Sequence, residues 1–210
     1  TNSDTEVVLH SIEEWGVQAI EKYRGMFAIA LYNNLEKKLT LFRDRAGVKP
    51  IFYYWSGGLF LFASELKAFH KHPLFKKNID NDALALYLKY CYVPAPYCIF
   101  ENTHKLLPGH YLEFDIQSSS FNIQKYWDVN DSYSKPKLKI DKEDAIEETE
   151  KILKESFDYR MVSDVPVGVF LSGGYDSSAV TALLQKDTAK KIKTFSNLLE
   201  SKFFIFLSFV

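Results

Sequence analysis

The hydrophobic positions near the start of the chain follow a helical period. Val8 and Ile12 begin an apolar stripe with the spacing of an amphipathic helix. Just before this stripe, Ser3 and Glu6 stand three residues apart, which is the pattern of a capping box. In that motif each side chain accepts a hydrogen bond from the backbone N–H of the other residue. The pattern predicts a helix over residues 4–22.

Four short apolar segments follow this helix and are separated by turn signals. They are residues 26–32, 38–42, 51–55 and 59–63. Residues 33–36 lie between the first two segments and residues 56–58 between the last two, so each pair is typical of a β-hairpin. We expect residues 25–63 to form an antiparallel meander. Because the segments are apolar at nearly every position, we expect a sheet covered on both faces, as in a layered sandwich with helices.

Helices and a further hairpin are predicted downstream of this sheet. Residues 64–70 have the pattern of a short helix. Residues 80–90 have the pattern of a second helix, with Asp80 as its N-cap. Residues 110–115 and 121–127 are apolar segments on either side of a serine-rich loop, which predicts a hairpin.

The composition changes in residues 128–142, where apolar residues become scarce and Asp, Ser, Lys and one Pro predominate. We expect a linker and a domain boundary there. Beyond it, residues 145–157 predict a long amphipathic helix and residues 165–171 a compact apolar strand. A glycine loop, another helix and a second strand at residues 192–195 follow. This order predicts a parallel sheet with a right-handed crossover, so the fold class is α+β before the boundary and α/β after it.

Composition and charge narrow the classes of function. The 210 residues carry 26 basic and 27 acidic side chains, and a net charge of −1 gives no broad attraction to nucleic acid or to an anionic membrane. No apolar stretch approaches the roughly 20 residues that span a bilayer. The two cysteines do not suggest a secreted disulfide framework. We expect a cytoplasmic protein with small-molecule substrates and with no nucleic-acid or membrane partner.

The segment that ends the strand at residues 165–171 has the composition of a phosphate-binding loop. It reads Leu171-Ser172-Gly173-Gly174-Tyr175-Asp176-Ser177-Ser178. Open α/β folds bind ligands at the carboxyl edge of the parallel sheet, and a helix N-terminus offers free N–H groups to an anion. Gly173 and Gly174 let the backbone approach phosphate oxygens, while the serine hydroxyls add donors. Because Asp176 favours a bridging cation such as Mg²⁺, the segment predicts a nucleotide site.

The spacing of this loop matches neither the Walker loop nor the dinucleotide-binding loop. It resembles the S-G-G-x-D-S pyrophosphate loop of the ATP pyrophosphatases. Five other segments resemble, in the same order, signatures of the glutamine-hydrolysing asparagine synthetases. They are residues 25–28, 43–50, 63–68, 105–111 and 163–169. The resemblance extends from Ser3 to about Ser196.

The resemblance implies two incomplete domains. Residues 1–127 would be the C-terminal part of a type 2 glutamine amidotransferase domain, a partial αββα sandwich of the Ntn-hydrolase type. Residues 128–142 would be a linker. Residues 143–196 would be the start of an asparagine synthetase domain, with the first βαβ unit of a parallel-sheet ATP pyrophosphatase. Residues 197–210 depart from the family pattern, and we expect an atypical tail written by a frameshift or a premature stop.

The resemblance also implies an activity and the residues that serve it. In such enzymes, ammonia from glutamine converts aspartate to asparagine with ATP and Mg²⁺ as cofactors, and glutamate, AMP and pyrophosphate are released. A homodimer is common in the family. Carried over by position, Asp4 would bind the α-amino group of glutamine, and Asp176 would hold Mg²⁺. The ATP-binding residues would be Leu171, Ser172, Gly173, Gly174, Asp176, Ser177 and Ser178.

The glutaminase nucleophile of the family is an N-terminal cysteine, and the first residue of this chain is Thr1. An internal cysteine has no free α-amino group to act as its base. We therefore expect no catalytic residue in this chain and no glutamine hydrolysis by it. Cys91 is expected to be a small core residue at a helix end, and Cys98 is expected to be semi-exposed.

Other interpretations of the same residues stay open. Tyr175 stands at the variable position of the loop, where Leu is common, and this leaves room for an amidotransferase that acts on another carboxylate, such as a sugar acid. A non-catalytic ATP-binding module is a third hypothesis. For one charged cluster we favour a salt-bridged turn at the sheet edge over direct chemistry. The cluster consists of Arg43, Asp44, Arg45 and Lys49.

Overall fold

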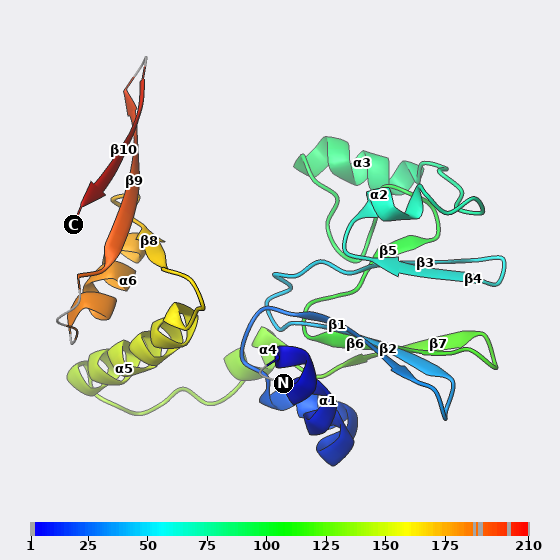
Figure 1. Ribbon diagram of the computed structural model, residues 1–210, viewed down its shortest axis with the longest axis horizontal. Coiled ribbons are helices and arrows are strands. Elements are labelled where there is room, and N and C mark those ends of the chain that lie inside the picture. The colour runs from blue at the N-terminus through cyan, green and yellow to red at the C-terminus, as the bar shows by residue number, and fades with distance from the viewer. Residues whose placement is uncertain (1–2, 187, 189–190, 201–202, 210) are drawn as a thin grey trace. The chain divides into compact units, whose positions relative to one another are not determined.

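The chain folds into two compact units, which Figure 1 shows as ribbons. The first unit ends at Lys135 and the second begins at Pro136. The structure is a computed structural model that describes residues 3–186, 188, 191–200 and 203–209.

The first unit is built around two antiparallel sheets. Its elements in chain order are α1 (Asp4–Trp15), the 3₁₀-helix η1 (Gly16–Lys22), β1 (Ala28–Asn33), β2 (Lys38–Arg43), β3 (Phe52–Ser56), β4 (Leu59–Ala63), α2 (Leu66–Phe69), α3 (Asn81–Tyr90), β5 (Thr103–Lys105), β6 (His110–Asp115), β7 (Ser120–Lys125) and α4 (Val129–Tyr133). One sheet has the strand order β1-β2-β6-β7, and the other has the order β4-β3-β5.

The two sheets pack face to face between helices, so the first unit has four layers (Figure 1). Leu41 and Leu112 lie in the core between the sheets and are fully buried. Because side chains alternate along a strand, the neighbouring Phe42 points to the other face of its sheet and packs against Ile20 of η1. On the far side, Phe69 of α2 covers the second sheet. The expectation that both faces of the strands are covered is confirmed for β2 and β3, whereas β1 has exposed residues along its length, among them Tyr32.

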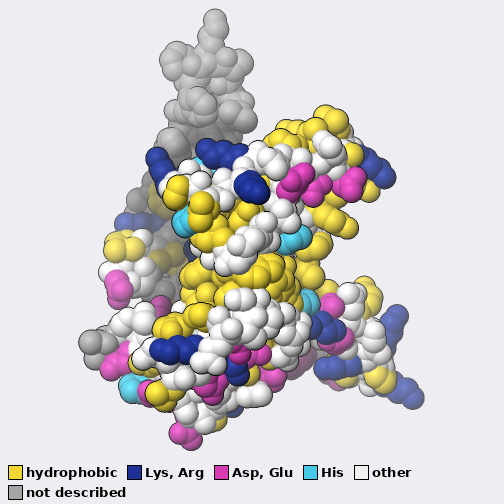
Figure 2. Space-filling view, turned by 90° about the vertical axis from the view of Figure 1, so that its right-hand side faces the viewer, with side chains coloured by type: hydrophobic (Ala, Val, Ile, Leu, Met, Phe, Trp, Pro, Cys, Tyr) yellow, Lys and Arg dark blue, Asp and Glu magenta, His cyan; other side chains and the backbone are white. Residues whose placement is uncertain are grey.

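The space between the sheets is filled largely by aromatic rings. Phe60 and Phe114 stack with their centroids 4.3 Å apart, and Trp55 meets Phe114 edge-on at 5.3 Å. Phe121 of β7 meets Tyr53 of β3 at 5.7 Å, so this packing joins the two sheets. Figure 2 shows hydrophobic side chains gathered across the middle of the face that it displays, at the level between the sheets.

Local turn and capping signals are confirmed where they depend on one polar side chain. The Asn33 carboxamide oxygen accepts hydrogen bonds from the Leu35 and Glu36 amides at 3.0 and 3.1 Å, and these bonds close the first hairpin. Asp80 caps α3 by accepting from the amides of the second and third helical residues at 2.9 and 3.0 Å.

Two sequence expectations for this unit are wrong in detail. The helix predicted over residues 4–22 changes at Gly16, whose φ of 61° is left-handed, and it continues as η1. Residues 25–63 do not form one meander, because β2 and β3 belong to different sheets. β2 pairs instead with β6, and this pairing sets Leu41 opposite Leu112.

The charged cluster at the end of β2 forms the turn that separates the two hairpins. Asp44 is completely buried, and its carboxylate accepts hydrogen bonds from the Val48 and Lys49 amides at 2.9 and 2.8 Å. The Arg43 guanidinium donates to the carbonyls of Gly47, Lys49 and Leu106. Burial lowers the pKa of Arg43, although the charge of Asp44 opposes this shift. The turn is therefore held by hydrogen bonds between charged side chains and the backbone, with Asp44 accepting and Arg43 donating.

A half-buried histidine, His104, is expected to make the stability of the first unit depend on pH. The His104 ring lies 5.3 Å from the Tyr53 ring, between centroids, and burial lowers the pKa of His104 below 6.5, with Asp80 opposing the shift. The unfolded chain therefore binds a proton more readily than the folded chain does. We expect the free energy of unfolding to be highest above pH 6.5 and to decrease as the pH falls below that value.

Urea unfolding at several pH values, followed by near-ultraviolet circular dichroism, measures this dependence. His104→Gln should reduce the loss of stability at acidic pH. The control is His10→Gln, because the side chain of His10 is 68% exposed and its ion pairs with Glu6 and Glu13 lie on the surface. An unchanged pH dependence in His104→Gln would contradict the assignment.

The second unit contains α5 (Lys142–Met161), β8 (Gly168–Phe170), α6 (Tyr175–Lys186), β9 (Lys193–Glu200) and β10 (Phe203–Phe209). β8 and β9 are parallel, as the strand–helix–strand order predicts. β9 extends further than expected and forms an antiparallel hairpin with β10, which occupies much of the expected tail. β8 is shorter than expected, because only residues 168–170 pair with β9. Phe170, although paired, is 80% exposed.

Both cysteine expectations are reversed by the structure. Cys91 is exposed, and it takes the left-handed position (φ 61°) that ends α3. Cys98 is buried, and burial raises the pKa of its thiol. In the described part of the chain, none of the helices has the length and apolar character needed to cross a membrane.

Candidate functional site

The glycine loop connects β8 to α6 and is fixed at its start by β9. The Leu171 amide donates to the Phe195 carbonyl at 2.8 Å, which extends the parallel pairing by one residue. The Ser196 hydroxyl donates to the Leu171 carbonyl at 2.7 Å. Leu171 is half-buried, whereas residues 172–176 are exposed. The loop therefore leaves the carboxyl end of a parallel strand and enters solvent before α6 begins.

Hydrogen bonds between the serines hold the loop in a compact turn. The Ser177 hydroxyl donates to the Gly174 carbonyl at 3.2 Å and accepts from the Ser172 amide at 3.2 Å. The hydroxyls of Ser172 and Ser177 lie 3.0 Å apart. The Ser178 amide donates to the Gly174 carbonyl at 3.1 Å and starts the hydrogen bonding of α6. The conformation of the loop from Ser172 to Ser177 is thus stabilised by hydrogen bonds of its own serine side chains.

The two glycines leave open space beside the backbone. Gly173 has a φ of 81°, a left-handed conformation that favours glycine, and an added Cβ would meet no atom within 4 Å. At Gly174 an added Cβ would meet only the Ser172 hydroxyl, at 3.8 Å. These glycines are therefore not required by close packing within the protein. The space is available to a ligand that approaches the backbone.

The charges at this turn suit a phosphate group with a cation. The first amides of α6, from Tyr175 to Ser177, belong to the turn in which a helix leaves N–H groups without intrahelical acceptors. The positive end of the helix dipole lies there as well. Asp176 is exposed in the same turn. Mg²⁺ in phosphate sites commonly uses one or two carboxylates together with the phosphates, so the loop fits a magnesium–nucleotide complex.

The part of the chain that the structure describes contains no metal site built from protein ligands alone. Among the described residues, no group of three or more His, Cys, Asp or Glu side chains is arranged to hold a metal ion. Any cation at Asp176 would therefore have to take most of its ligands from phosphate and water.

Asp4, the residue assigned to glutamine binding, belongs to the first unit and is not part of this loop. It is the first residue of α1 and is exposed. The helix is capped by the neighbouring Ser3, whose hydroxyl accepts from the Thr5 amide at 3.3 Å. The Asp4 carboxylate is therefore not needed as the cap, and its charge stands at the positive end of the helix.

Ser196 is a member of the site that the sequence analysis missed. Its hydroxyl fixes the Leu171 carbonyl from the adjacent strand. A signal was present in the sequence, because Ser196 directly follows the predicted strand at residues 192–195. The carboxyl ends of parallel strands meet at one edge of a sheet, so a polar residue at that place can reach the loop.

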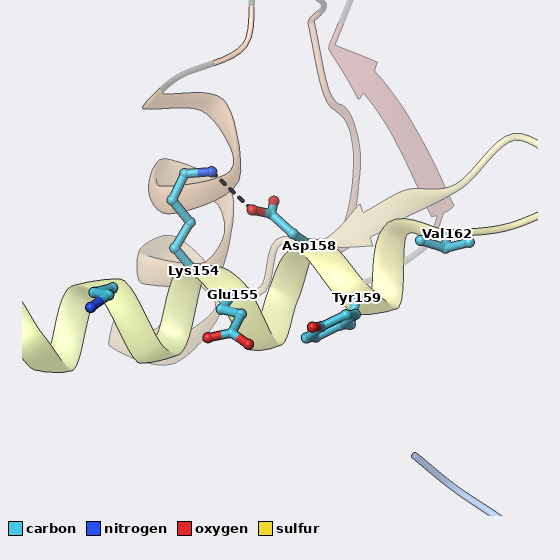
Figure 3. Close-up of a pocket in the computed structure, with 6 residues that line it drawn as sticks. Lys154, Glu155, Asp158, Tyr159 and Val162 are labelled. Atoms are coloured by element: carbon cyan, nitrogen blue, oxygen red, sulfur yellow. Dashed lines mark hydrogen bonds and ion pairs between the residues drawn. The ribbon is translucent and has the colours of Figure 1, made fainter. Parts of the chain in front are cut away.

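A shallow hollow of about 430 Å³ also lies along α5 in the second unit (Figure 3). Lys154 and Asp158 point toward each other across one helical turn there and form an ion pair of 3.0 Å. The rest of the hollow is lined by Lys151, Glu155, Tyr159 and Val162. An exposed ion pair of this spacing is ordinary on a helix surface, and the glycine loop remains the better candidate site.

Comparisons with known proteins agree with both parts of this architecture. Residues 1–127 match the family model of the glutamine amidotransferase domain, and residues 148–204 match that of asparagine synthase. The chain belongs to the glutamine-hydrolysing asparagine synthetase family. The match to the synthase model extends beyond Ser196, where the resemblance seen in the sequence alone ends.

Two relatives from the asparagine synthetase family match almost the whole length of this chain. It is 39% identical to a putative asparagine synthetase [glutamine-hydrolyzing] 2 of Methanocaldococcus jannaschii over 206 residues, which are 97% of the chain and 39% of the relative. It is 35% identical to asparagine synthetase [glutamine-hydrolyzing] 3 of Bacillus subtilis over 199 residues, 92% of the chain and 31% of the relative. The chain thus spans well under half the length of these relatives.

Proposed function

We propose that this chain contributes to glutamine-dependent asparagine synthesis and that the loop at residues 171–178 binds the phosphates of ATP. Residues 1–127 would be part of the glutaminase domain, residues 128–142 the linker, and residues 143–196 the start of the ATP-dependent synthetase domain. The observation that carries the proposal is the exposed glycine turn between a parallel strand and a helix N-terminus, in which a Cβ added at Gly173 would meet no described atom within 4 Å.

Each residue of the loop has a distinct part in this proposal. The backbone at Gly173 and Gly174 allows close approach of a phosphate, and the first amides of α6 donate to its oxygens. Ser172 and Ser177 keep the turn in shape, while Ser178 offers an exposed hydroxyl. Leu171, anchored to β9, lies where the loop begins and contacts the nucleotide.

Asp176 would hold Mg²⁺ together with the phosphates. When bound, the cation neutralises charge that develops on the leaving pyrophosphate during adenylation of a carboxylate. The chain's own donors are preorganised for the same task, because hydrogen bonds within the loop orient them before a ligand arrives.

In the glutaminase part, Asp4 would accept hydrogen bonds from the α-ammonium group of glutamine. An exposed carboxylate that is not used for capping is free to pair with an amino-acid substrate. The substrates of the whole enzyme would be glutamine, aspartate and ATP.

Magnesium dependence is the property that tests this assignment. ATP should bind the full chain about tenfold more tightly with Mg²⁺ than with a chelator present, because the cation links Asp176 to the phosphates. In Asp176→Asn this enhancement should disappear, while the binding measured without Mg²⁺ remains. Isothermal titration calorimetry provides both affinities.

The matched control is Asp164→Asn, which removes an exposed carboxylate of the same unit outside the loop. It should leave the magnesium enhancement unchanged. Absence of saturable ATP binding, or an equal enhancement in Asp176→Asn and the unsubstituted chain, would contradict the proposed role of Asp176.

A further inference from the structure

The first unit contains an apolar cavity that the proposed function does not use. It has a volume of about 610 Å³, within the usual range of small-molecule sites. Its wall comes from several elements, because Phe52 begins β3, Leu66 begins α2, and Leu84 and Tyr87 project from α3. The cavity is thus part of the packing between the second sheet and the helices that cover it.

One residue that lines this cavity differs from the others in carrying a charge. Lys105, at the end of β5, is the one charged residue among the described lining residues. Its ammonium group donates to the Val93 carbonyl, but it forms no salt bridge with any carboxylate that the structure describes. Burial lowers the pKa of Lys105, and the charge of Arg43 lowers it further, whereas Cys98 opposes the shift.

A partly buried cation without a nearby counter-ion is unfavourable, and an anion placed beside it would relieve that cost. Asp80 is an acidic residue of this region, since its charge acts on Cys98 and His104. Its carboxylate is engaged in capping α3. The position beside Lys105 is therefore open to an anion from outside the protein.

The helix beside the cavity also exposes apolar side chains to solvent. Leu84 is 37% exposed, Tyr87 is 49% exposed, and Leu88, one turn after Leu84, is 74% exposed. A hydrocarbon group at this surface would cover Leu84 and Tyr87 and be stabilised by burial of apolar area. Both the mouth and the interior of the cavity therefore favour a hydrocarbon group as ligand.

We propose that this cavity binds an amphipathic monocarboxylate, with its hydrocarbon part against Phe52, Leu84 and Tyr87 and its carboxylate paired with Lys105. A single compact ammonium matches a single carboxylate charge, whereas a phosphate dianion would remain half uncompensated. The site is separate from the glycine loop, so its failure would leave the proposed ATP site unaffected.

A series of ligands with one chain length tests the charge preference on the full chain. Decanoate, decanol and decylamine present the same hydrocarbon with a negative, neutral or positive head. We expect calorimetry to show decanoate binding about tenfold more tightly than decanol, and decylamine binding most weakly, because only the carboxylate makes a charge-assisted hydrogen bond. Equal affinities for the three, or no saturable binding, would overturn the proposal.

Substitutions assign this preference to Lys105. Lys105→Met, which keeps an unbranched apolar side chain, should bring decanoate and decanol to the same affinity. The control Lys89→Met changes a lysine of α3 that does not line the cavity, and it should retain the preference. If Lys105→Met does not fold, Leu84→Glu is the alternative, because it places a negative charge in the cavity wall. This charge should weaken the binding of decanoate more than the binding of decanol. A preference that survives these changes would contradict the assignment.

A thiol at the cavity locates the ligand. Cys91 lines the cavity and is exposed, whereas Cys98 is buried. Saturating decanoate should slow the alkylation of Cys91 by iodoacetamide several-fold, and mass spectrometry of the cysteine-containing peptides measures the rate. Unchanged alkylation of Cys91 in the presence of bound decanoate would place the ligand elsewhere and refute the proposed site.

Discussion

Gly109→Ala should lower the free energy of unfolding of the chain by about 3–5 kcal/mol, because it combines a left-handed backbone with a direct clash. Gly109 has a φ of 66°, and an added Cβ would lie 2.2 Å from the Trp127 carbonyl oxygen. The backbone there cannot yield easily, since Gly109 accepts hydrogen bonds from the Tyr126 and Trp127 amides at 2.9 and 3.1 Å and donates to the Asp44 carbonyl. Urea unfolding measures the change.

The control for this variant is Gly57→Ala. Gly57 also has a positive φ, 57°, but an added Cβ there would meet no atom within 4 Å. We expect this substitution to cost about 1 kcal/mol, the usual penalty of a left-handed alanine. The difference between the two variants isolates the clash with Trp127. Equal losses in both would show that backbone conformation alone matters at Gly109.

Gly174→Val should weaken ATP binding about a hundredfold or more without a comparable loss of stability, because side-chain atoms would occupy the space that the phosphates need. The φ of Gly174 is not left-handed, and an added Cβ would approach only the Ser172 hydroxyl, at 3.8 Å. The substitution should therefore be tolerated by the fold. Calorimetric titration with ATP and Mg²⁺ gives the affinity, and thermal unfolding of the same sample gives the stability.

Thr149→Val is the matched control for Gly174→Val, since it introduces valine at an exposed position of α5 in the same unit. ATP affinity should not change in this variant. If Gly174→Val bound ATP as tightly as the unsubstituted chain, the phosphates would have to lie away from this backbone, and the loop would be only a connection between β8 and α6.

Features that depend on one residue and its near neighbours could be predicted from the sequence. Asp80 caps α3, Asn33 closes the first hairpin, and the glycine pair after a strand forms an exposed turn before a helix. In each case the determining interaction is local. A short polar side chain accepts a hydrogen bond from an unpaired backbone amide, or a glycine adopts a left-handed backbone conformation. The candidate loop belongs to this class, so its position could be predicted.

Features that depend on residues distant in the chain could not be predicted in the same way. The pairing of Leu41 with Leu112 places two separate hairpins in one sheet, and hydrophobic alternation gives no information about which strands pair. The bond from Ser196 to Leu171 depends on β9 lying beside β8. Each of these features is determined by which strands pair in the folded chain.

The most direct test of the proposed nucleotide site is to map where magnesium pyrophosphate binds. In heteronuclear NMR spectra of the isotopically labelled full chain, we expect saturable changes in the amide resonances of residues 171–178 and of Ser196, with only small changes in the first unit. Changes confined to other parts of the chain, or none at saturating ligand, would contradict the assignment of this loop to the phosphates of ATP.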